Sequence, residues 1–363
     1  MSFFLVLLFL VFLNILVMVH ESGHFLIARL TGMKVHEFSV GFGPRLWSAE
    51  KRGIKYSLRA ILLGGYVKIA GMDQALEGEP TYTSPDDPGH FFNKPLWARI
   101  AVILAGSVFN ILFAVLMFIF IFKFFGIPIG SDKPIIGYIN PQQPSYYAGL
   151  REGDRIASID GQPVRTWSDI SRYAKKAGNK RLTLVIERNG KEFIVGVHTE
   201  YSPYLKKYII GIGPQIEGFT TVSWKRAIWG GISQPGNILA GIIQAVKKRE
   251  KLGLMGPIGA AEQVSGFRGE GVFYNFLFYM AILGVSLGYL NLLPLPLPLL
   301  DGGWVVIFLL EAFRRKPFSE TTKSYAQIAA MLLVLGLFIF ILYRDIANMI
   351  FRKLAEFKMG AGK

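Results

Sequence analysis

Four long runs of apolar residues constrain this chain more than any other feature of its sequence. They cover residues 2–19, 100–125, 272–293 and 326–343, with few or no charged side chains inside them. About 20 apolar residues form a helix long enough to cross the hydrocarbon core of a bilayer. Because only 18% of the 363 residues are charged, the sequence predicts a polytopic α-helical membrane protein with four transmembrane helices.

A fifth uncharged run, residues 228–246, allows two interpretations. It contains Pro235 and several amides, and basic residues stand at both of its ends. These properties are more typical of an amphipathic segment lying on the membrane surface than of a span. We therefore predict an interfacial amphipathic region over residues 216–270 and keep a fifth transmembrane helix as the alternative.

Basic residues predict the orientation of the chain in the membrane. No Lys or Arg precedes the first apolar run, whereas Arg29, Lys34 and Arg45 follow it. The positive-inside rule therefore places the N-terminus outside and residues 31–95 in the cytoplasm. Residues 126–271 are then extracytoplasmic. The basic C-terminal tail would also end outside, which runs against the rule.

Composition limits the partners and the chemistry of the chain. The formal net charge of +15 suits anionic lipid or nucleic acid, and the apolar runs favour the lipid bilayer, with no nucleic-acid partner. The sequence has no cysteine and only five histidines. Disulfides, thiolate metal sites and a cysteine nucleophile are thereby excluded.

His20, Glu21 and His24 form the pattern H-E-x-x-H at the end of the first apolar run. Residues four apart share one face of a helix, so both imidazoles can bind one metal ion while Glu21 lies beside a water on it. Ionisable side chains at membrane depth are costly and are mostly functional. The motif therefore indicates a zinc site rather than polar residues that merely end a membrane helix.

A catalytic zinc site generally has three protein ligands and an open position for water. Asp301 is the best candidate for the third ligand, because it is the only carboxylate between Glu270 and Glu311 and follows the third apolar run. On its own, an aspartate here would also suit the N-cap of a helix. With four spans Asp301 emerges on the same side as the histidine pair, whereas five spans would place it on the opposite side.

Together, these motifs resemble the site-2 protease family of intramembrane zinc metalloproteases, specifically its bacterial regulator-of-sigma-E branch. The resemblance covers nearly the whole chain. Besides the two motifs, residues 64–71 look like the membrane-associated β segment of that branch, residues 105–110 like its second-span motif, and residues 256–259 like the stretch before its third span.

The resemblance implies that His20, His24 and Asp301 bind Zn²⁺ and that Glu21 is the general base. It also implies a role in substrate binding for Asn291, although this residue lies ten positions before Asp301 where the family usually has eight. Many members have a histidine at the position that Trp304 occupies here.

The region between the second and third spans has short apolar runs and turn residues in place of long apolar runs. Alternating apolar runs flank Asn189-Gly190, a pair that favours a tight β-hairpin. Residues 148–161 resemble part of a PDZ domain, and the sequence contains one copy. PDZ domains bind extended peptides by strand addition. On this resemblance, a peptide C-terminus would bind at Gly211, Ile212 and Gly213, and the alternative is a domain that only excludes bulky substrates.

The predicted fold class is thus a polytopic α-helical membrane protein with a membrane-associated β segment and one inserted extracytoplasmic PDZ domain. Its parts are set out here in chain order. They are a first transmembrane helix (1–30), a cytoplasmic loop with the β segment (31–95), a second helix (96–125), the PDZ domain (126–215), the interfacial region (216–270), a third helix with the Asp301 loop (271–313), and a fourth helix with the tail (314–363).

The resemblance implies an enzyme of the bacterial inner membrane that acts in regulated intramembrane proteolysis. Its substrates would be transmembrane segments of single-pass proteins, such as anti-sigma factors, or signal-peptide remnants. An edge strand with Gly64, Gly65, Tyr66 and Val67 would hold such a substrate extended. The rival interpretations are a catalytically silent membrane adaptor with a PDZ domain and a metal-ion transporter, which would need more ionisable residues in its spans.

Overall fold

The computed structural model describes residues 2–72, 84, 86–139, 143–202, 207–247, 260, 264, 271–296 and 298–360. The chain divides into two units. Unit 1 comprises Met1–Met117 and Leu254–Lys363, and unit 2 comprises Phe118–Gly253. Most of the region 248–270 lies outside the described residues. This includes residues 256–259, which resemble the stretch before the third span of the site-2 protease family.

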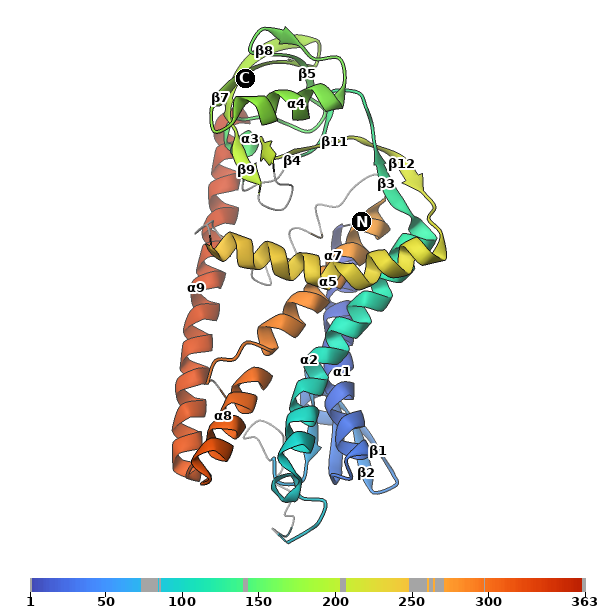
Figure 1. Cartoon of the computed structure of the whole chain (residues 1–363), viewed down its shortest axis with the longest axis vertical. Helices are drawn as coiled ribbons and strands as arrows, with labels where there is room; N and C mark the ends of the chain where they lie inside the picture. The colour runs from blue at the N-terminus through green and yellow to red at the C-terminus, as the bar shows by residue number, and fades with distance from the viewer. Residues whose placement is uncertain are drawn as a thin grey trace. The chain divides into compact units, whose positions relative to one another are not determined.

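Long apolar helices dominate unit 1 (Figure 1). In the described part of the chain, four helical segments are long and apolar enough to cross a membrane, which agrees with the predicted number of spans. They belong to α1 (Ser2–Leu30), α2 (Leu96–Phe120, continued by the π-helix Ile121–Phe125), α7 (Val272–Asn291) and α9 (Glu320–Gly360). A shorter helix, α8 (Asp301–Arg314), lies between α7 and α9 in the chain.

Glycines allow the spanning helices of unit 1 to approach one another closely. A Cβ at Gly23 of α1 would lie 2.5 Å from the carbonyl oxygen of Ala105 in α2. A Cβ at Gly288 of α7 would lie 2.7 Å from the side chain of Ile111 in α2. Small residues are typical of tight helix–helix contacts in membranes, where close packing replaces the hydrophobic driving force. These contacts fix α2 against both α1 and α7.

A long β-hairpin packs beside α1. Strands β1 (Val35–Lys51) and β2 (Ile54–Ile69) pair antiparallel, with several irregularities in their register. Gly64 has a φ of +128°, which residues with a Cβ rarely adopt. Its backbone N–H donates to Oδ1 of Asn14 at 3.3 Å, so the one amide in the first half of α1 attaches the hairpin to that helix.

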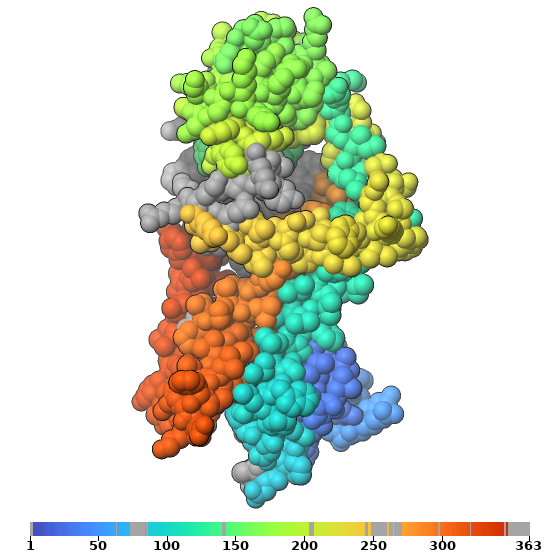
Figure 2. Space-filling view, in the orientation of Figure 1, coloured from blue at the N-terminus to red at the C-terminus, as the bar shows by residue number. Residues whose placement is uncertain are grey.

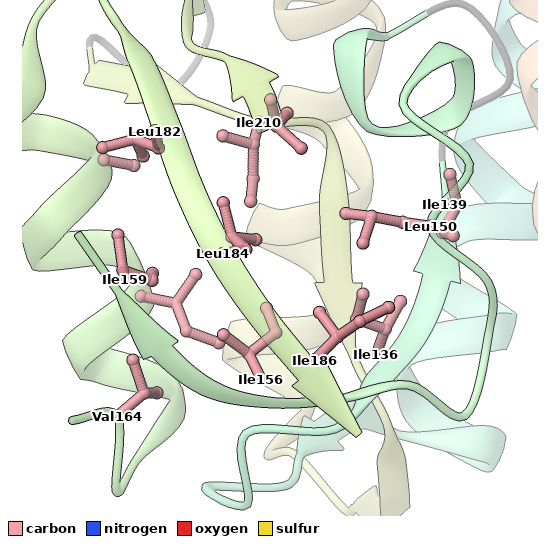
Figure 3. Packing of buried hydrophobic residues seen from close by; sticks show 13 residues of the cluster. Ile136, Ile139, Leu150, Ile156, Ile159, Val164, Leu182, Leu184, Ile186 and Ile210 are labelled. Atoms are coloured by element: carbon pink, nitrogen blue, oxygen red, sulfur yellow. The ribbon is translucent and has the colours of Figure 1, made fainter. Parts of the chain in front are cut away.

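Unit 2 contains a four-stranded sheet in the order β6-β5-β7-β8. Its central strands bury a cluster of aliphatic side chains that includes Ile156, Leu184 and Ile186 (Figure 3). Asn189 and Gly190 both have positive φ values of 52° and 73° at the turn between β7 and β8, as the predicted hairpin requires. The elements are β5 (Arg155–Ile159), β6 (Gln162–Pro163), α4 (Trp167–Ala177), β7 (Arg181–Arg188) and β8 (Lys191–His198).

Three further strand pairs and two helices complete unit 2. Because β12 pairs with β3, the segment after residue 215 returns to the segment that follows α2. The pairs are β3 (Ile127–Gly130) with β12 (Ile216–Thr220), β4 (Ile136–Ile139) with β11 (Ile212–Pro214), and β9 (Glu200–Ser202) with β10 (Lys207–Ile209); the helices are α3 (Pro144–Tyr147) and α5 (Trp224–Lys247).

Helix α5 corresponds to the fifth uncharged run, and it is not one of the four helices apolar enough to span a membrane. It is visible in yellow in Figure 2. Its first residue, Trp224, packs edge-on against Phe124 and lies under the ammonium group of Lys123. Large apolar side chains are exposed along α5, namely Ile228, Trp229, Ile232, Leu239, Ile242, Ile243 and Val246. This exposure is compatible with the predicted interfacial segment.

An ion pair in unit 2 joins a buried aspartate to an arginine whose side chain is 20% exposed. Asp154 is 1% exposed, and Arg188 donates to both of its carboxylate oxygens at 2.7 Å. Asp154→Ala is expected to lower the free energy of unfolding by about 3–5 kcal/mol, because it leaves the Arg188 charge without its partner. Urea unfolding of the purified full-length protein measures this change. Glu187→Ala removes the exposed pair with Arg155 and should cost about 1 kcal/mol or less; equal losses for both variants would contradict the prediction.

Candidate metal centre

The H-E-x-x-H residues lie inside the continuous helix α1, which runs on to Leu30. His20 and His24 are therefore one turn apart on the same face. Their rings are 4.7 Å apart at an interplanar angle of 85°, and the two Nε2 atoms are 3.1 Å apart. The two imidazoles thus point their Nε2 atoms at a common point.

Asp301 reaches the same point from the first residue of α8. Its Oδ2 is 3.5 Å from Nε2 of His20, and its Oδ1 is 3.8 Å from Nε2 of His24. One ligand atom from each of the three residues lies within 4.8 Å of the others. No other such group of His, Asp or Glu occurs among the residues that the structure describes. The structure therefore brings together the three residues that the sequence singled out as ligands.

The donor set fits a catalytic zinc ion. Two imidazole nitrogens and one carboxylate oxygen make three protein ligands, the number that leaves a position for water or substrate. Nδ1 of His24 lies 2.8 Å from the carbonyl oxygen of Val102. A carbonyl only accepts, so this Nδ1 carries the proton and Nε2 keeps a free lone pair. The ring is held in the tautomer that binding through Nε2 requires.

Helix α2 supports the histidine pair through a glycine. A Cβ at Gly106 would lie 2.7 Å from Cε1 of His20 and still closer to Nε2 of His24. Gly106→Ala is therefore expected to displace the rings and to weaken zinc binding about 10-fold or more, as measured by competition with a chromogenic chelator. Gly336→Ala is the control, since a Cβ there meets nothing within 4 Å. Unchanged zinc affinity in Gly106→Ala would refute this packing argument.

A cavity of about 220 Å³ opens onto the three candidate ligands and Glu21. Apart from these four residues, side chains and backbone of three other segments line it. The segments are the β-hairpin with Met72 just after it, the first half of α2, and the loop that leads into α8 together with the first turn of that helix. Their lining residues are Phe42, Gly65, Tyr66, Val67, Ile69, Met72, Val102, Ile103, Pro298, Leu299, Leu300 and Trp304. An apolar wall around four polar groups is typical of a small-molecule or peptide site.

Glu21 lies in the wall of this cavity, next to His20 in the chain. The backbone N–H of Val67 in β2 donates to its carboxyl group. The carboxyl group therefore contacts the hairpin and lines the same cavity as the candidate ligands. This is the position that a general base for a metal-activated water needs.

A polar network holds the hairpin where it enters the cavity wall. Arg59 donates to Glu37 at 3.1 Å, to the hydroxyl of Tyr66 at 2.6 Å and to Ser39 at 3.1 Å. Burial alone would raise the pKa of Glu37, but the hydrogen bond from Arg59 and its positive charge outweigh burial and lower that pKa. Burial and the Glu37 charge raise the pKa of Tyr66, so its phenol stays protonated at neutral pH.

Not every predicted site residue meets the cavity. Gly65, Tyr66 and Val67 line it, whereas Gly64 does not and contacts Asn14 instead. Asn291 is the last residue of α7 and is not among the lining residues, because the loop 292–300 separates it from Asp301.

The predicted peptide-binding loop belongs to unit 2. Gly211 has a φ of +87°, and its carbonyl accepts a hydrogen bond from the hydroxyl of Ser145 at 3.1 Å. Ile212 and Gly213 belong to β11, which pairs with β4. This loop therefore has a fixed conformation at the start of a strand.

Three residues around the metal centre had little or no signal in the sequence. The carbonyl of Val102 bonds His24, the hydroxyl of Ser107 donates to Asp301 at 2.7 Å, and Trp304 lines the cavity one turn after Asp301. Ser107 lies within residues 105–110, which resemble the second-span motif of the site-2 protease family. This resemblance was the only indication of Ser107 in the sequence. A backbone carbonyl such as that of Val102 leaves no mark on the sequence at all.

Comparisons with known proteins find similar chains in several bacteria. A family model described as Peptidase family M50 matches residues 8–337. Relatives in Agrobacterium fabrum and Mesorhizobium japonicum are both 32% identical, over 94% and 93% of this chain and 95% and 97% of theirs. A relative in Clostridium acetobutylicum is 29% identical over 95% of this chain and 98% of its own. The names of all three begin "Putative zinc metalloprotease".

Among solved structures, the PDZ domain of an SdrC-like protein from Listeria monocytogenes matches 25% of this chain and 94% of its own length. The two are 15% identical, with a TM-score of 0.21. A score this low carries no argument about unit 2.

Proposed function

The chain belongs to peptidase family M50, the site-2 protease family, and from this premise we propose that it is an intramembrane zinc metalloprotease. The observation that carries the proposal is the convergence of His20, His24 and Asp301 on one point, with Glu21 in the wall of the adjoining cavity. The reaction is hydrolysis of a peptide bond in the transmembrane segment of a single-pass protein.

His20, His24 and Asp301 are the residues that would hold the zinc ion. When bound, zinc supplies a Lewis acid for the scissile carbonyl and lowers the pKa of water. Glu21 accepts the proton of the attacking water and delivers it to the leaving amine.

The β-hairpin provides a means to hold the substrate. A helical peptide bond is protected by its own backbone hydrogen bonds, so the substrate has to unwind before it is cut. Strand β2 pairs only with β1 in the described part of the chain, and its residues 65–67 line the cavity. The unwound substrate adds to this edge as an extended strand. Pro294, Pro296 and Pro298 lack backbone donors and keep the facing loop non-helical.

The proposal extends to location and partners. The enzyme lies in the bacterial inner membrane, with its N-terminus and unit 2 outside the cytoplasm, as the distribution of basic residues predicts. Unit 2 acts as a PDZ domain, and the loop at Gly211, Ile212 and Gly213 receives the C-terminus of a shortened substrate. Anti-sigma factors and signal-peptide remnants are the substrates implied by the family resemblance.

Reconstitution with a single-pass test substrate examines the proposal directly. The purified protein is placed in liposomes with a substrate that retains its transmembrane segment and a short flank, and mass spectrometry locates the cut. We expect cleavage inside the apolar segment. Cleavage only in the soluble flank would contradict an intramembrane reaction. Binding of the substrate tail without any cleavage would favour the adaptor.

A further inference from the structure

Ser107 makes a contact that the proposed reaction does not yet use. Its hydroxyl donates to Oδ2 of Asp301 at 2.7 Å, although the two residues are 194 positions apart in the chain. Ser107 is 0% exposed. The side chain of Asp301 is 15% exposed, so the bond joins α2 to the first residue of α8 in a largely buried setting, where a hydrogen bond to a charged acceptor is stronger than in water.

The helix of Ser107 offers this hydroxyl another partner. A buried serine in a helix commonly donates to the carbonyl four residues earlier. Ser22 of α1 does so, with its hydroxyl 2.6 Å from the carbonyl oxygen of Met18. The hydroxyl of Ser107 instead turns out of its own helix toward a carboxylate. A serine that only needed a hydrogen-bond acceptor could donate to a carbonyl of its own helix. The bond to Asp301 therefore indicates that Ser107 acts on this carboxylate.

Asp301 is the ligand that most needs external support. The two histidines share one helix, but Asp301 follows the loop 292–300, which contains three prolines. Ser107 is itself held firmly, because a Cβ at Gly288 of α7 would lie only 3.0 Å from its carbonyl oxygen. The firmly packed helix thus fixes the orientation of the carboxylate at the end of the loop.

One short stretch of α2 contacts all three candidate ligands. Val102 accepts from His24, Gly106 packs against both imidazoles, and Ser107 donates to Asp301. Partners of this kind orient metal ligands, and their loss typically weakens metal binding by about 10- to 100-fold. We propose that Ser107 is a positioning residue that presets the Asp301 carboxylate for the metal ion. This inference rests on the proposed metal centre.

Zinc affinity of the purified, metal-stripped protein tests the proposal without reference to activity. We expect Ser107→Ala to raise the dissociation constant for zinc about 10- to 100-fold, measured by chelator competition. Thr31→Ala is the control, since Thr31 directly follows α1 and its hydroxyl donates to the carbonyls of Ile27 and Ala28 in the last turn of that helix. Its dissociation constant for zinc should stay within about twofold of wild type. Cobalt substitution gives a second readout, because the d–d spectrum should change in Ser107→Ala and not in Thr31→Ala.

A double-mutant cycle separates positioning from a general effect on folding. If Ser107 acts through Asp301, Ser107→Ala should have almost no further effect on the residual cobalt affinity of the Asp301→Ala background, titrated at cobalt concentrations high enough to occupy its weakened site. Equal effects in both backgrounds would overturn the proposal. So would wild-type zinc affinity in Ser107→Ala while Asp301→Ala loses zinc, and in that case the metal centre itself would stand. If wild type binds no zinc, the proposed function fails together with this inference.

Discussion

Glu21→Gln is expected to lower kcat for cleavage of a transmembrane substrate by about 10²- to 10⁴-fold, the usual contribution of a general base. Glutamine has nearly the size of glutamate and can still accept the hydrogen bond from Val67, but it cannot take a proton from water. His20, His24 and Asp301 are untouched by the change. The variant should therefore retain about one zinc ion per chain while it loses its activity.

The measurement pairs single-turnover cleavage in liposomes with elemental analysis of the same protein. Glu50→Gln is the matched control, because Glu50 is an exposed carboxylate near the end of β1 and does not line the cavity. Its rate should equal that of wild type. If Glu21→Gln cleaves within about tenfold of wild type, another group serves as the base. If it loses its zinc, Glu21 supports the metal centre instead.

Asp301→Ala is expected to remove the metal itself. The change deletes one of three protein ligands, so zinc affinity should fall by more than the ~100-fold that the loss of an outer partner costs. Cleavage should disappear with the zinc. Asp301→Asn preserves the shape of the side chain and should also lose zinc, because the neutral amide is a much poorer ligand than a carboxylate.

Elemental analysis and chelator competition measure this effect in detergent solution. Asp132→Ala, a change to an exposed aspartate of unit 2, serves as the control and should keep its zinc. If Asp301→Ala and Asp301→Asn both retain zinc and activity, the third ligand lies elsewhere. The topological argument for four spans would then also lose its main support.

The part of the site that follows from local periodicity was predictable. His20 and His24 share a helix face because their spacing matches one turn, and no tertiary information is needed for this. Asp301 required an additional argument, namely that four spans return the chain to the same side of the membrane. The structure brings these three side chains within one ligand sphere. The four helices and the Asn189-Gly190 hairpin follow from equally local patterns.

Contacts between distant segments were not predictable in the same way. The hydroxyl of Ser107 and the carbonyl of Val102 meet their partners only because α2 packs closely on α1 and α7. The pairing of β3 with β12 likewise joins strands some 90 residues apart. A role of Asn291 in substrate binding was inferred from a family motif. Asn291 does not line the cavity, whereas Pro298, Leu299 and Leu300 of the following loop do. None of these arrangements has a periodic signature.

Zinc titration of the metal-stripped protein, with cleavage measured at each step, shows whether a single zinc ion held by His20, His24 and Asp301 supports cleavage within a transmembrane segment. We expect no cleavage without metal and a rise in activity that levels off at about one equivalent of zinc per chain. Full cleavage by the metal-free protein, or none at any zinc level, would contradict it.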